Sequence, residues 1–100
     1  MHKHETKAQG IDLEAAEALI AALQRDLAKV SAGSADLQIL EGEVEALRNV
    51  LVSPRPKRRR VKEALHDIRA ALEHALETVE GEAIRDWPYI AEIGRILGMR

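Results

Sequence analysis

Three consecutive stretches of this chain carry apolar residues at alternating steps of three and four, a spacing that averages 3.5. This spacing places every apolar residue on one narrow stripe of an α-helix, the stripe that helices bury against one another. In chain order the three ladders are Leu13, Ala16, Ile20, Leu23, Leu27, Val30; then Leu37, Leu40, Val44, Leu47, Leu51; and then Val61, Leu65, Ile68, Leu72, Ala75, Val79. The sequence therefore predicts an all-α protein built as a coiled-coil-like bundle.

Local signals divide these ladders into helices. Asp12 is an N-cap candidate for the first helix, and Gly33 marks a short turn that makes the first two helices an antiparallel hairpin. Residues 53–56, Ser-Pro-Arg-Pro, cannot continue a helix, and Pro56 is suited to begin the third one. We expect helices at about 12–32, 35–52 and 57–80, followed by a short C-terminal helix at about 88–98.

The first residues of the chain lack this pattern. Residues 1–10 are polar apart from Met1 and Ala8, so we expect a disordered leader over 1–11 and a single bundle domain over 12–100. No apolar run approaches the roughly 18 residues that span a bilayer, and the start lacks the apolar core of a signal peptide. The expected location is the cytoplasm.

A core for this domain must be aliphatic, because the chain has no Phe, one Trp and one Tyr. The predicted buried seam consists of Leu23, Leu27, Leu40, Val44, Leu47, Leu65, Ile68 and Leu72. One hundred residues without any Cys make a small domain that no disulfide stabilises. Apolar residues off the seam, such as Leu19, Ile39 and Val50, exceed what a narrow core needs. The chain is therefore expected to be a homo-oligomer, at least a dimer, or to bind a protein partner.

The most function-like motif is the basic run that follows Pro54. Its six cations are Arg55, Lys57, Arg58, Arg59, Arg60 and Lys62. They form either a solvated loop attracted to acidic helix faces, or a sequence-independent binding site for nucleic acid or an anionic surface, or a nuclear import signal. Cations in the first turn of a helix oppose its dipole, so the placement is locally unfavourable and another role could retain it.

The C-terminal segment is a second candidate, since its apolar residues cover more than one helix face. These residues are Trp87, Tyr89, Ile90, Ile93, Ile96 and Leu97. They belong either to a helix that closes the bundle with Trp87 as its anchor, or to a docking surface for a second copy or a larger partner, or to a helix at a membrane interface.

No constellation for catalysis or metal binding stands out. The histidines form two loose pairs, His2 with His4 and His66 with His74, which is short of the three or four convergent ligands of a metal site. The chain also has no Gly-rich phosphate loop and no nucleophile–base pair suggested by spacing. We expect no metal, no cofactor and no enzymatic activity.

The second half of the chain resembles a family of small uncharacterised bacterial helical proteins, some of them encoded near phage-defence or other conflict genes. The similarity runs from Leu47-Arg48 through the basic loop, Ala64-Leu65, Ile68-Arg69 and Leu72-Glu73 to the ending Ile90-Ala91-Glu92-Ile93-Gly94-Arg95-Ile96-Leu97-Gly98. The resemblance covers about half of the chain and implies a non-catalytic accessory or assembly module. It carries over no functional residue.

Taken with the ladders, these features predict a non-catalytic helical interaction and oligomerisation module. The alternative is a binder of nucleic acid or of an anionic surface that uses the basic loop at 55–62. The two differ in salt dependence, because phosphate binding by several cations weakens steeply as salt rises.

Overall fold

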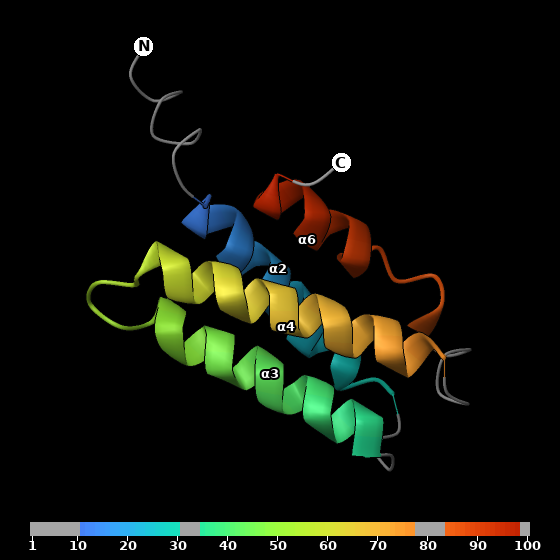
Figure 1. The fold of residues 1–100 in the computed structure, drawn as a ribbon. Helices are drawn as coiled ribbons and strands as arrows, with labels where there is room; N and C mark the ends of the chain where they lie inside the picture. The colour runs from blue at the N-terminus through green and yellow to red at the C-terminus, as the bar shows by residue number, and fades with distance from the viewer. Residues whose placement is uncertain (1–10, 31–34, 78–83, 99–100) are drawn as a thin grey trace.

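In a computed structural model of the chain, residues 11–30, 35–77 and 84–98 are described. Their regular structure is entirely helical, which confirms the all-α prediction: α2 is Leu13–Leu27, α3 is Ala35–Leu51, α4 is Arg58–Leu76 and α6 is Tyr89–Leu97 (Figure 1). Residues 1–10 of the leader predicted over 1–11, the turn at Gly33 and the last ladder position, Val79, lie outside the described residues.

These helices form a bundle in which each packs against two others. α3 packs against α2 and α4, and α6 packs against the same two helices from the other side. Figure 1 shows α2 and α3 as an antiparallel hairpin, with α4 antiparallel to α3 and α6 antiparallel to α4. The short α6 covers only part of the length of the 19-residue α4. The bundle is therefore closed on its fourth side by a helix about half as long as its neighbour.

The predicted seam is the core of this bundle. All eight of its residues are buried: Leu23, Leu27, Leu40, Val44, Leu47, Leu65, Ile68 and Leu72. Full burial of one such side chain contributes roughly 1.5–3 kcal/mol to stability. The apolar stripes are thus covered within a single chain.

The ends of α2 show how local hydrogen bonds set helix length. The carboxylate of Asp12 accepts a hydrogen bond from the amide of Ala15 at 3.2 Å, which confirms it as the N-cap. The helix ends at Leu27 rather than near residue 32, so the predicted end was too late. The amide of Val30 bonds the carbonyl of Leu27, three residues back, at 3.2 Å. Such a bond tightens the chain into a turn instead of extending the α-helix.

α3 begins at the predicted residue, whereas α4 and α6 each begin one residue after the predicted point. Lys57 is extended, with φ −81° and ψ 123°, and serves as the N-cap of α4, so Pro56 precedes the helix instead of starting it. α6 ends at Leu97, and its C-cap Gly98 has a φ of 77°, in the left-handed region that glycine adopts without a steric penalty. No helix in the described ranges combines the length and apolar content needed to cross a bilayer.

Candidate functional site

The basic run lies in the connection from α3 to α4 and in the first turns of α4. We call residues 53–62 the basic turn. All six of its cations are exposed. Arg59 is the one that pairs with a carboxylate of the described residues, its Nε lying 3.8 Å from Glu63 on the same helix. In the described part of the chain, the predicted attraction to the acidic faces of other helices therefore forms no ion pair.

The start of α4 is electrostatically unfavourable. Its first turn holds Arg58, Arg59 and Arg60 with no acidic residue, and the N-cap Lys57 makes no side-chain capping bond. The amide groups at a helix N-terminus carry partial positive charge, and cations there destabilise the helix by a few tenths of a kcal/mol each. Side chains and backbone thus present positive charge together at one end of the bundle.

A groove of about 510 Å³ lies directly beside this turn, between the end of α3 and the start of α4. Its apolar part comes from Ala46 and Val50 of α3. Three cations of the basic turn, Arg55, Lys57 and Arg60, complete its lining with Asn49 and Ser53. The groove is a partly apolar surface with a strongly basic end.

An exposed apolar residue of α3, outside the groove, lies in line with the groove's apolar part. Ile39 precedes Ala46 by seven residues and Val50 by eleven, so the three side chains follow one line on the helix surface. We call these three residues the α3 flank. Ile39 is 56% exposed although it is a large apolar residue. Val52, 71% exposed, points to the side of α3 that faces α2, where it lines a second groove.

The C-terminal candidates turn mostly inward. Tyr89 and Ile93 are buried, at 5% and 0% exposure, and the other four pack against the core while partly buried: Trp87, Ile90, Ile96 and Leu97. We expected the apolar residues of this segment to favour association with another chain. Most of them instead pack against the core of their own chain. Leu19, also predicted to lie off the seam, is buried as well.

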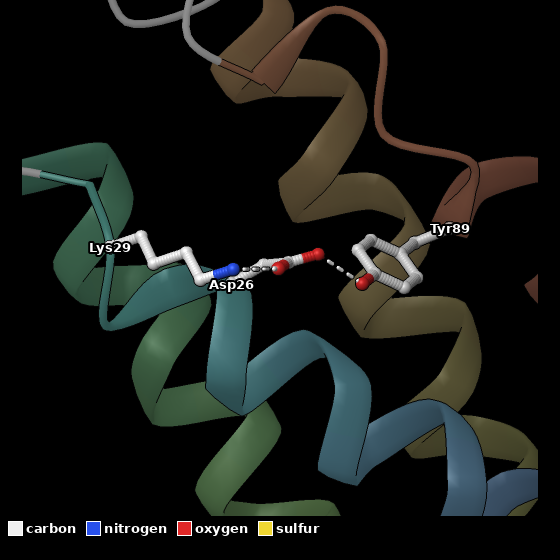
Figure 2. A network of polar contacts seen from close by, with 3 residues as sticks. All are labelled: Asp26, Lys29 and Tyr89. Carbon is white, nitrogen blue, oxygen red and sulfur yellow. Dashed lines mark hydrogen bonds and ion pairs between the residues drawn. The ribbon is translucent and has the colours of Figure 1, made fainter.

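A polar contact fixes the start of α6 against the end of α2. The hydroxyl of Tyr89 donates a hydrogen bond to Asp26, whose other carboxylate oxygen lies 3.8 Å from the ammonium of Lys29 (Figure 2). Burial, followed by the hydrogen bond and the negative charge of Asp26, raises the pKa of Tyr89 to about 12. Trp87 meets the Tyr89 ring edge-on, with the ring centroids 5.6 Å apart. The raised pKa keeps the phenol neutral as a hydrogen-bond donor, and this arrangement anchors the start of α6.

The histidines of α4 are exposed, and one of them joins two helices. His74 Nε2 lies 3.1 Å from the carboxylate of Asp36, in the first turn of α3. His66 and His74 share no third ligand, since no group of three metal-ligating side chains occurs among the described residues. His2 and His4 lie outside those residues.

Comparisons with protein-family models, curated proteins and solved structures find no match to this chain. Its function is therefore inferred from its surface and core. The sequence identified the basic run, and it marked Ile39 and Val50 as surplus apolar residues. It did not reveal that Val50 lines one groove with Arg60 of the basic turn, because that depends on how α3 and α4 are aligned.

Proposed function

We propose that this chain is a non-catalytic helical interaction module that binds a protein partner through the α3 flank and the neighbouring groove. The apolar ladders are covered within one chain, so folding alone does not require a partner. The interaction surface is the outer side of α3, where Ile39 is exposed and Val50 is half-buried against the core. An accessory or assembly role, as the resemblance to small bacterial helical proteins implies, is consistent with this proposal.

The observation that carries the proposal is the exposure of Ile39 in line with the groove. Its side chain is 56% exposed, and the same line leads to Ala46 and Val50 beside three cations. Exposed apolar area that continues into a groove favours association, because a partner that covers it removes that area from water. The cations at one end would orient a partner that carries complementary charge.

In-cell photocrosslinking of the full chain tests this proposal. A photoreactive amino acid replaces Ile39 in one variant and Ala70, exposed on α4, in a matched control. The proposal predicts a protein adduct at position 39 that is absent or much weaker at position 70. Equal or absent protein adducts at the two positions would contradict it.

A second candidate function is sequence-independent binding of nucleic acid or of an anionic surface through the basic turn. It is favoured by five exposed cations that pair with no carboxylate in the described residues: Arg55, Lys57, Arg58, Arg60 and Lys62. Binding of labelled duplex DNA should then fall steeply between low and moderate salt, because each phosphate contact releases counterions. Weak binding that changes little with salt would exclude this alternative.

A further inference from the structure

The alignment of α3 with α4 places residues of the two helices side by side on one face of the bundle. Asp36 lies beside His74, and Val50 and Arg60 line the same groove. Because the two helices are antiparallel, moving one residue forward along α3 corresponds to moving one residue back along α4. Glu43 then falls beside Asp67, and Ala46 beside Ala64.

The charge of this face changes sign at Ala46 and Ala64. Toward the basic turn, the groove holds Arg60 and Lys57. On the other side of Ala46, Glu43 and the exposed Asp67 form an acidic layer. The sequence has four carboxylates and no Lys or Arg over 35–47, and seven Lys or Arg and no carboxylate over 48–62. Of these, Glu41, Glu45 and Arg48 line the grooves toward α2 and do not belong to this face.

We propose that a second copy of this chain packs on this face in antiparallel orientation, with the two-fold axis at Ala46. Rotation about that axis places the Val50 and Arg60 layer of each copy over the Glu43 and Asp67 layer of the other. The same rotation brings the two α3 flanks together. The proposal rests on the proposed interaction function and specifies its partner.

Charge complementarity selects a second copy as the occupant. An isologous interface joins the same patch of two subunits, so the patch must be complementary to itself. This face meets that condition, because Glu43 precedes Ala46 by three residues and Val50, which shares its groove with Arg60, follows it by four, about one helical turn on either side. An unrelated acidic partner would match the basic turn but not the acidic layer.

Gly42 supports this arrangement. It lies in the middle of α3 on an exposed position, and a Cβ built there would meet nothing within 4 Å. Glycine weakens a helix interior relative to alanine, and no close contact within the described chain requires it here. Close approach of a second α3 would use the space that this glycine leaves.

The first test is the mass of the full chain in solution by analytical ultracentrifugation, up to high micromolar concentration. We expect a dimer of twice 11.1 kDa. Its dissociation constant should increase as salt rises, because salt screens the charges that hold the two copies together. Ala46→Asp brings two identical charges together at the axis and should raise the dissociation constant at least about tenfold. The circular dichroism spectrum should be unchanged, because Ala46 is exposed in the single chain.

A charge exchange identifies the face. Arg60→Glu should weaken the dimer, and adding Asp67→Arg to the same chain should restore it, because each layer then meets its opposite again. Arg58→Glu is the matched control. It makes the same charge change in the same helical turn, but on the side of α4 away from α3, so the dimer should persist.

Three results would overturn the inference: a monomer at every concentration, a dimer insensitive to Ala46→Asp, or equal effects of Arg60→Glu and Arg58→Glu. These outcomes are distinct from failure of the proposed function. A monomeric chain that still forms an adduct through position 39 with another protein would retain the interaction function and lose the second copy. A monomer without any such adduct would lose both.

Discussion

The Tyr89 hydroxyl hydrogen-bonds the carboxylate of Asp26, joining the first residue of α6 to the last turn of α2, 63 residues earlier in the chain. α6 has only nine residues, and a helix of that length is not stable alone in water. It depends on tertiary contacts, of which this one is polar and directional. The buried phenol therefore positions the helix that closes the bundle.

Tyr89→Phe should destabilise the protein by about 1.5–3 kcal/mol, because it removes a hydrogen bond to a charged acceptor that is partly buried. The ring itself stays, so packing against Trp87 is retained. Urea unfolding followed by circular dichroism measures the change. A loss of less than about 0.5 kcal/mol, the size of an ordinary surface substitution, would mean that the contact does not anchor α6.

Stability should also fall at alkaline pH in a way that depends on Tyr89. Its pKa is raised from 10.0 to about 12 in the folded protein. Because the folded state holds the phenolic proton more tightly, this contribution is fully present below pH 10 and is lost as pH rises from 10 toward 12. The unfolding free energy of the wild type should decline over that interval more steeply than that of Tyr89→Phe. Parallel pH profiles for the two proteins would contradict the assignment.

Truncation of core leucines should be far more costly than truncation of the α3 flank. Leu40→Ala and Leu65→Ala, both at fully buried positions, should each cost about 2–5 kcal/mol. Ile39→Ala, at a mostly exposed position of the same helix as Leu40, should change the unfolding free energy by no more than about 0.5 kcal/mol in the monomer. Thermal or urea unfolding at a concentration below any association distinguishes the two classes.

The sequence predicted the core well because heptad spacing depends only on the helix period. Every predicted seam residue is buried. The end of α2 was misplaced because periodicity continues through Val30, whereas the backbone closes into a turn after Leu27. Val30 still packs against the core from that turn, so its apolar character fits the structure without a helix.

The candidate site was harder to predict, because it combines residues from two helices. Ile39 and the basic run were both visible in the sequence, but the groove that Val50 and Arg60 line together depends on the length and path of the connection between α3 and α4. The C-terminal apolar residues were equally visible. Their spacing alone does not show whether they face a partner or the core. They face the core because α6 packs on α2 and α4.

Gly42→Ala should stabilise the isolated chain by about 0.5–1 kcal/mol. The position is exposed and in the interior of α3, where alanine is the better helix former, and the added methyl group has open space around it. Thermal unfolding at low concentration measures this gain. No gain or a loss would show that the helix backbone at this position needs glycine for a reason within the chain.

Replacing Lys57, Arg58, Arg59 and Arg60 together by glutamine should leave the fold intact and make α4 slightly more stable. All four side chains are exposed, and three of them lie in a first turn without any acidic residue, where cations oppose the helix dipole. The gain should be a few tenths of a kcal/mol per residue at low ionic strength and should shrink as salt screens the charges. Circular dichroism and urea unfolding at two salt concentrations check both points. An unfolded variant would mean instead that the basic turn stabilises the bundle by pairing with acidic groups. If the variant stays folded but loses affinity for duplex DNA that the wild type binds at low salt, the basic turn is a phosphate-binding surface as well.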